Sequence, residues 1–116
     1  MEIKHRSIEI YEQADGKRPY ETWLNNLKDK MARARIRARI DKVATGNFGD
    51  YKSIDKGIFE LRLNFGPGFR IYYAYKNEII VILLIGGDKS GQNKDIEKAK
   101  VYWNDFQERT NEKSKH

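Results

Sequence analysis

The stretch from Phe59 to Ser90 reads FELRLNFGPGFRIYYAYKNEIIVILLIGGDKS, and it decides the fold because three strand patterns follow one another with short connections. In Phe59–Phe65, apolar and polar residues alternate, as in a strand with one buried face. Gly66-Pro67-Gly68 predicts a tight turn, since glycine tolerates positive φ and proline fixes φ near the turn value. A second strand is expected over Phe69–Lys76. The apolar run Ile79–Ile85 predicts a third, central strand covered on both faces.

Helical patterns flank these strands. The preceding part predicts an irregular first strand over Glu2–Tyr11, a helix that opens at Pro19, and a second helix over Lys30–Val43 with an apolar stripe. After the third strand, Asp95–Phe106 predicts a last helix, and 107–116 a polar, disordered tail. The expected order is β-α-α-β-β-β-α. This is an α+β fold in which a small, mostly antiparallel sheet has the N-terminal helices on one face and a polar row on the other.

Length and composition indicate one domain and an anionic partner. The chain has 116 residues, 34% of them charged, and a formal net charge of +6. No apolar stretch approaches the ~20 residues of a membrane-spanning helix and no signal-peptide pattern is present, so we expect the cytoplasm and no membrane partner. The absence of cysteine excludes disulfides and thiolate chemistry. The positive charge favours nucleic acid, the ribosome surface or an acidic protein as partner.

Three basic residues of the strand region form the candidate site. Arg62 and Arg70 lie on neighbouring strands joined by the glycine turn, and Lys89 follows the third strand in a glycine-flanked loop. A guanidinium binds phosphate through two parallel hydrogen bonds, whereas a lysine acts as a compact charge. Together they are suited to hold a phosphodiester and to stabilise the charge of its transition state. The alternative is a cross-strand ion pair, such as Glu60 with Arg70, beside a solvated lysine.

Other polar residues add to this hypothesis. Tyr72 shares the expected face of Arg70, where a tyrosine can stack on a base or assist proton transfer. Arg35 and Arg39 form an i, i+4 pair on the second helix; they can bind RNA, or their stems can lie along the core edge of a solvated helix. The two histidines, His5 and His116, do not suggest a metal site, and the sequence predicts neither a metal nor a cofactor.

Several short segments occur together in an order that one bacterial family shares. They are Pro19-Tyr20-x-x-Trp23-Leu24, Ala34-Arg35-Ile36-x-x-Arg39-Ile40, Gly46-Asn47-x-Gly49-Asp50, Glu60-Leu61-Arg62, Gly66–Tyr73, Leu83–Ser90, and then Gln92, Asp95-Ile96 and Ala99. Through them the chain, from about Tyr11 to Phe106, resembles the RelE/ParE superfamily of type II toxins. Within it, the chain is most similar to the HigB-like addiction module killer proteins.

The resemblance implies a RelE-like, microbial-RNase-like toxin domain over 1–106. It implies a metal-independent endoribonuclease, an mRNA interferase that cuts translated messages on the ribosome. It also implies a cognate antitoxin, usually a helix-turn-helix, HigA-like protein, held with the toxin in a hetero-oligomer. The family's basic residues fall on Arg62, Arg70 and Lys89. On this hypothesis the 2′-oxygen attacks phosphorus, the arginines stabilise the transition state, and Lys89 or Tyr72 assists proton transfer; either group requires a lowered pKa to take the 2′-hydroxyl proton.

Two other functions are compatible with the same fold, because function lies in the site and not in the fold. One is a ParE-like inhibitor of DNA gyrase. The other is a non-toxic relative that acts only through binding its antitoxin. The clustered Arg62, Arg70 and Lys89 favour RNA cleavage over both.

Overall fold

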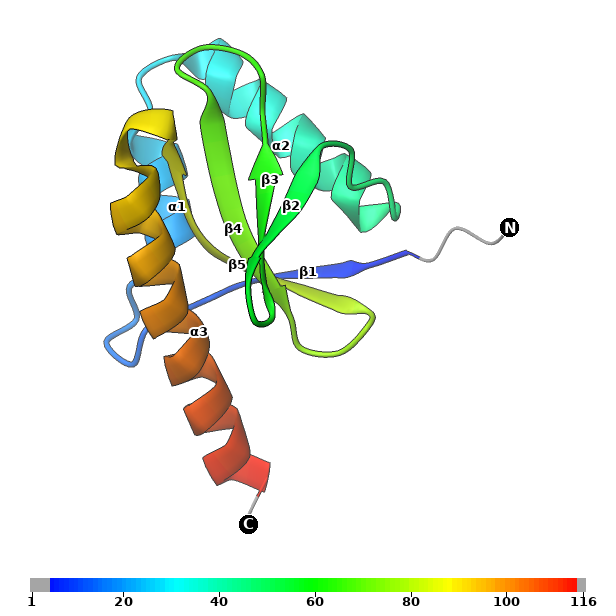
Figure 1. The fold of residues 1–116 in the computed structure, drawn as a ribbon, viewed down its shortest axis with the longest axis vertical. Coiled ribbons are helices and arrows are strands. Elements are labelled where there is room, and N and C mark those ends of the chain that lie inside the picture. The colour runs from blue at the N-terminus through cyan, green and yellow to red at the C-terminus, as the bar shows by residue number, and fades with distance from the viewer. Residues whose placement is uncertain (1–4, 115–116) are drawn as a thin grey trace.

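The structure, a computed structural model that describes residues 5–114, consists of one sheet with helices on both faces (Figure 1). Its elements are β1 (Ser7–Ile10), α1 (Pro19–Asn26), α2 (Lys30–Ala44), β2 (Tyr51–Asp55), β3 (Ile58–Arg62), β4 (Phe69–Tyr75), β5 (Ile80–Asp88), the short 3₁₀ turn η1 (Lys89–Gly91) and α3 (Gln92–Ser114). The α+β class is as predicted, but the described chain contains one strand more than the expected order.

The strands lie in the order β1-β5-β4-β3-β2, so that β4 is central, β5 is an interior strand rather than the predicted central one, and β1 and β2 are the edges. β1 pairs in parallel with β5, and all other neighbours are antiparallel. The edge position of β1 agrees with its irregular pattern; of the predicted Glu2–Tyr11, positions 1–4 lie outside the described residues. β2 was not predicted. Its side chains are mostly exposed and its register shifts between Ser53 and Asp55, which leaves no clear alternation.

The glycine turn joins β3 to β4 as predicted. Gly66 and Gly68 have φ of 56° and 80°, which only glycine adopts without strain. β3 ends at Arg62 rather than Phe65, but the N–H of Leu63 still donates to the carbonyl of Phe69 at 3.0 Å. In this register Arg62 lies directly opposite Arg70.

Helices α1 and α2 pack on one face of the sheet. α1 has Pro19 at its first turn, and the side chain of Asp29 caps α2 by accepting from two N–H groups of its first turn. The buried residues of this layer include Tyr20, Leu24, Ile36, Val43, Leu61, Ile71, Tyr73 and Leu83. The predicted apolar stripe of the second helix therefore lies in the core.

Helix α3 covers the other face, which was predicted to carry an open polar row. The predicted stripe of Ile96, Ala99, Trp103 and Phe106 packs there against a second buried cluster, which includes Tyr11, Ile58, Tyr72, Ala74, Ile82 and Leu84. α3 continues to Ser114, past the point where the polar tail was predicted to begin, and 115–116 lie outside the described residues. The polar residues that β3 and β4 contribute to this face, Glu60, Arg62 and Arg70, lie toward the glycine turn, beside this buried cluster.

Candidate functional site

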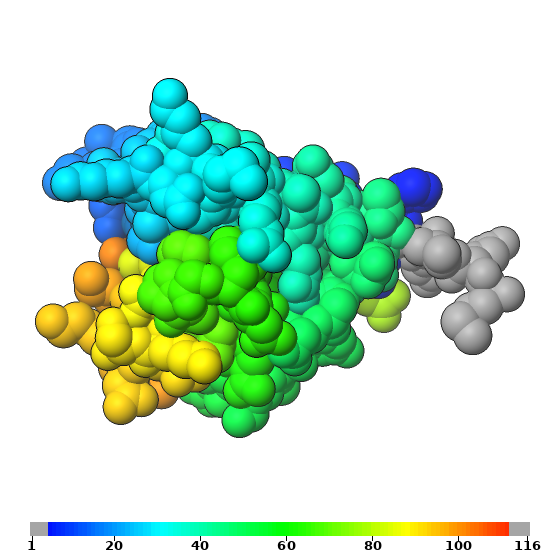
Figure 2. Space-filling view, turned by 90° about the horizontal axis from the view of Figure 1, so that it is seen from above, coloured from blue at the N-terminus to red at the C-terminus, as the bar shows by residue number. Residues whose placement is uncertain are grey.

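The three predicted basic residues meet where the β3–β4 hairpin approaches the start of α3. Arg62 and Arg70 are directly opposite on β3 and β4. The N–H of Lys89 donates to the carbonyl of Gly68 at 3.1 Å. Its methylenes cover this glycine, since a Cβ added at Gly68 would lie 2.9 Å from Lys89 Cε. Seen end-on in Figure 2, the hairpin (green) lies between the start of α2 (cyan) and the start of α3 (yellow).

A buried carboxylate, Glu60, lies at the centre of this group. It is fully buried, and its Oε1 accepts from Arg62 Nε at 2.9 Å. Arg70 Nε lies 3.8 Å from the same oxygen, which is an ion-pair distance too long for a hydrogen bond. Gln92 Nε2 donates to Oε2 at 2.7 Å. The hydrogen bond that Arg62 donates to Glu60 raises the pKa of Arg62. The cluster of cations and the ion pair, which the sequence left as alternatives, are therefore both present.

The three cations differ in exposure. The side chain of Arg62 is 32% exposed and that of Arg70 only 8%. Lys89 is exposed. Arg70 Nη1 donates to the carbonyls of Phe69 at 3.0 Å and Gly68 at 3.3 Å, so this guanidinium braces the hairpin from inside. Arg62 and Lys89 are exposed enough to contact an anion in solution. Arg70 is buried and contributes its positive charge without such contact.

Tyr72 is not placed as the mechanism expected. Its side chain is fully buried, which prevents stacking on a base. Its hydroxyl is buried without a hydrogen-bond partner in the described part of the chain. Burial, followed by the negative charge of Glu60, raises the pKa of Tyr72, whereas a role as base required a lowered pKa. The structure thus speaks against Tyr72 as the proton acceptor.

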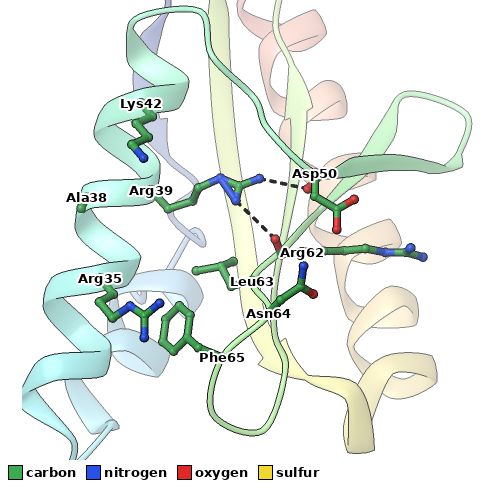
Figure 3. A pocket seen from close by; sticks show the side chains of 9 residues that line it. All are labelled: Arg35, Ala38, Arg39, Lys42, Asp50, Arg62, Leu63, Asn64 and Phe65. Atoms are coloured by element: carbon green, nitrogen blue, oxygen red, sulfur yellow. Dashed lines mark hydrogen bonds between the residues drawn. The ribbon is translucent and has the colours of Figure 1, made fainter.

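The two arginines predicted on the second helix line a groove of about 370 Å³ between α2 and the hairpin (Figure 3). Arg39 donates to the carbonyls of Phe48 at 2.6 Å, Asp50 at 3.0 Å and Arg62 at 3.3 Å, and it thereby anchors the loop that follows α2. Burial lowers its pKa. The guanidinium of Arg35 lies 3.8 Å from the centre of the Phe65 ring. Arg62 also lines this groove and its carbonyl accepts from Arg39, while its side chain extends away from α2 in Figure 3 and bonds to Glu60.

Sequence reasoning missed three residues of the site. Glu60 was considered as an ion-pair partner and as part of a family pattern, and Gln92 only as part of that pattern. Lys52 lies opposite Glu60 on β2 and therefore on the same face, where it is exposed. The alternation of Glu60 with Arg62 contained the signal that these two side chains share a face. Nothing in the sequence pattern signalled Lys52, because β2 itself was not predicted.

Carboxylates near the start of α3 serve local structure. Asp88 Oδ1 accepts from the N–H of Ser90 at 2.9 Å, and hydrogen bonding by Ser90 lowers the pKa of Asp88. Burial raises the pKa of Asp95, whose carboxylate lies against Gly87. The part of the chain that the structure describes contains no group of three or more His, Cys, Asp or Glu side chains arranged to hold a metal ion. It also contains no helix long and apolar enough to cross a bilayer.

Comparison with known proteins places these residues in a family. Residues 22–104 match the family described as phage-derived protein Gp49-like (DUF891). An uncharacterized protein of Haemophilus influenzae is 52% identical over 82 residues, which cover 71% of this chain and 83% of that protein. The family match includes the whole cluster of Glu60, Arg62, Arg70, Lys89 and Gln92. The chain belongs to the phage-derived Gp49-like family.

Proposed function

We propose that this protein is the toxin of a type II toxin–antitoxin module and a metal-independent endoribonuclease that cuts mRNA on the ribosome. One observation carries the proposal: two accessible cations, Arg62 and Lys89, converge with the buried Arg70 at the open end of the sheet. Cations in this arrangement suit a phosphodiester and the extra negative charge of its transition state. The resemblance to RelE-like and HigB-like toxins supports the same reaction.

In the proposed reaction the ribose 2′-oxygen forms a bond to the adjacent phosphorus, and the bond from phosphorus to the 5′-oxygen breaks. The products are a 2′,3′-cyclic phosphate and a 5′-hydroxyl. Arg62 and Lys89 contact the non-bridging oxygens, and Lys89 protonates the departing 5′-oxygen. Tyr72 is buried and its pKa is raised, so the proton of the 2′-hydroxyl passes to solvent or to a group of the ribosome.

Dependence on the ribosome fits the shape of this site. The cations lie on an open end of the molecule, where they can stabilise charge but cannot by themselves hold a flexible RNA in line for attack. Alignment of the reacting atoms also contributes strongly to the rate, and a ribosome that holds the message can supply it. The net charge of +6 suits both this partner and an acidic segment of a cognate antitoxin that would cover the site.

The test uses purified protein, ribosomes programmed with a defined mRNA, and the same mRNA without ribosomes. We expect cleavage on the ribosome only, with cyclic phosphate ends, and strongly reduced cleavage by Lys89→Gln and Arg62→Gln. Lys76→Gln is the matched control, because this exposed lysine follows β4 at the end of the strand away from the hairpin. Intact mRNA with the unchanged protein, or equal rates for Lys89→Gln and Lys76→Gln, would refute the proposal.

A further inference from the structure

We infer that Glu60 and Gln92 are positioning residues: the buried carboxylate of Glu60 fixes the guanidinium of Arg62, and Gln92 fixes that carboxylate from the start of α3. The inference rests on the proposed function, because it assigns how the RNA-contacting arginine is held before the substrate arrives. It adds two residues that touch neither the RNA nor the reacting atoms.

Side chains from three elements surround the carboxylate of Glu60. Both oxygens of Glu60 are engaged, Oε1 by Arg62 Nε at 2.9 Å and Oε2 by Gln92 Nε2 at 2.7 Å. Arg70 adds a second cation at 3.8 Å. The carboxylate, fully buried, is therefore held by side chains from β3, β4 and α3 at once. Such a carboxylate has one orientation available to it.

The fixed carboxylate orients the guanidinium of Arg62 before the RNA binds. The bond to Glu60 uses Nε, and the terminal Nη groups of a guanidinium form the fork that matches two phosphate oxygens. A long side chain that is one third exposed would otherwise sample many rotamers and lose that freedom when the RNA binds. Ordering it beforehand removes this cost from the reaction.

Gln92 holds the carboxylate of Glu60 from the start of α3. It is the first residue of α3, 32 positions from Glu60 in the chain, and half-buried. Its neutral amide supplies a donor to the carboxylate without adding a charge that would compete with Arg62. Because Gln92 is half-buried at the helix start, its exchange removes one hydrogen bond to the buried carboxylate and leaves the two apolar clusters unchanged. The cost in stability is that of one lost hydrogen bond, which makes Gln92 a milder position to test than Glu60.

The test compares single-turnover cleavage on programmed ribosomes by Gln92→Met and by Asn93→Met, the exposed neighbour on α3 that serves as matched control. We expect Gln92→Met to slow cleavage by on the order of 100-fold, the size of effect that a small misplacement of a reacting group produces. Ribosome binding should stay unchanged, while the thermal midpoint should fall, because Gln92→Met leaves one oxygen of the buried carboxylate without its donor; the rates are therefore compared well below the midpoint. Asn93→Met should behave as the natural protein. A rate for Gln92→Met equal to that of Asn93→Met would overturn the inference.

A double variant separates positioning from a general structural effect. If Gln92 acts through Glu60 on Arg62, then adding Gln92→Met to an Arg62→Gln protein should cause no further loss of rate. An equal loss in both backgrounds would overturn the inference. In NMR spectra, the Nε–H signal of Arg62 should be sharp in the natural protein and broadened in Gln92→Met. An unchanged signal would also count against the inference.

Failure of the inference and failure of the proposed function give different results. If the natural protein leaves ribosome-bound mRNA intact, the nuclease proposal falls, and the catalytic role of Glu60 and Gln92 falls with it. If the natural protein cuts and Lys89→Gln does not, but Gln92→Met cuts at the full rate, only the inference falls. Glu60→Gln is less decisive, because it leaves the buried Arg70 without a carboxylate and so lowers stability together with activity.

Discussion

At the scale of single residues, the strand position of Arg70 was predicted correctly, but its side chain is buried and does not face solvent as an RNA contact would. Its position after the glycine turn, opposite Arg62, followed from strand alternation and a short connection. Its burial did not follow, because a sequence does not show that Glu60 and the carbonyls of Gly68 and Phe69 surround the guanidinium. Arg70 therefore contributes to stability, and Arg62 and Lys89 are the better residues for a functional test.

The exchange Arg70→Met should lower the free energy of unfolding by about 3 kcal/mol, since it removes one partner of a buried ion pair. Glu60 keeps Arg62 and Gln92, which limits the loss. Lys89→Met, at an exposed position, should leave the urea midpoint unchanged. Urea denaturation of both variants measures the difference. An Arg70→Met protein as stable as the Lys89→Met protein would show that the buried pair does not stabilise the fold.

At the scale of elements, the sequence predicted those features whose signal lies within a short segment of the chain. The glycine turn, the capped and striped α2 and the apolar run of β5 each carry their signal within a few residues. The parallel pairing of β1 with β5 joins segments about 70 residues apart, which no local pattern encodes. The edge strand β2 has too few buried residues to show an alternation. The length of α3 was underestimated because its last turns are polar.

Two successive glycines of β5 lie where side chains of α1 and α3 approach the sheet closely. A Cβ at Gly86 would lie 2.2 Å from the ring of Trp23 on α1, and a Cβ at Gly87 would lie 1.9 Å from the carboxylate of Asp95 on α3. The ring is held against Phe69, whereas the end of an aspartate side chain can rotate. We expect Gly86→Ala to cost about 1–3 kcal/mol, as overpacking does, and Gly87→Ala less. Thermal unfolding of the two variants gives the order, and the reverse order would contradict this packing.

At the scale of the whole molecule, most tyrosines are protected from ionisation by the fold. Burial is the first cause of a raised pKa for Tyr11 and Tyr20, each to about 12. The same cause raises the pKa of Tyr72, Tyr73, Tyr75 and Tyr102. In the unfolded chain these groups ionise near 10. The folded protein therefore binds more protons between pH 10 and 12, and stability that is complete below pH 10 should fall as pH rises through about 12.

Ultraviolet absorbance of tyrosinate during an alkaline titration checks this expectation. Most of the signal should appear only above pH 10 and together with the loss of helical circular dichroism. If all the tyrosines ionised with a midpoint near 10 in protein that was still folded, the buried positions assigned to them would be wrong.

The site itself is a property of the whole molecule, and the sequence predicted only part of it. Strand alternation and turn chemistry were enough to bring Arg62, Arg70 and Lys89 together. The burial of Glu60 and the contact from Gln92 depend on where α3 begins, and a helix was expected only from Asp95 onward. The helix arginines were grouped with the site by charge; they share a groove with Arg62, but Arg39 is engaged by backbone carbonyls and Arg35 lies over the Phe65 ring, which a charge pattern does not show.

A map of RNA 5′ ends across the transcriptome, made shortly after this protein is induced in a bacterium, tests whether the protein cuts translated mRNA. Lys89→Gln is the site variant and Lys76→Gln the matched control. We expect new ends inside translated reading frames with the natural protein and with Lys76→Gln, and none with Lys89→Gln. Growth arrest with an unchanged end map would contradict this expectation and favour a gyrase inhibitor. Undisturbed growth at high expression would contradict it in favour of a non-toxic, antitoxin-binding relative.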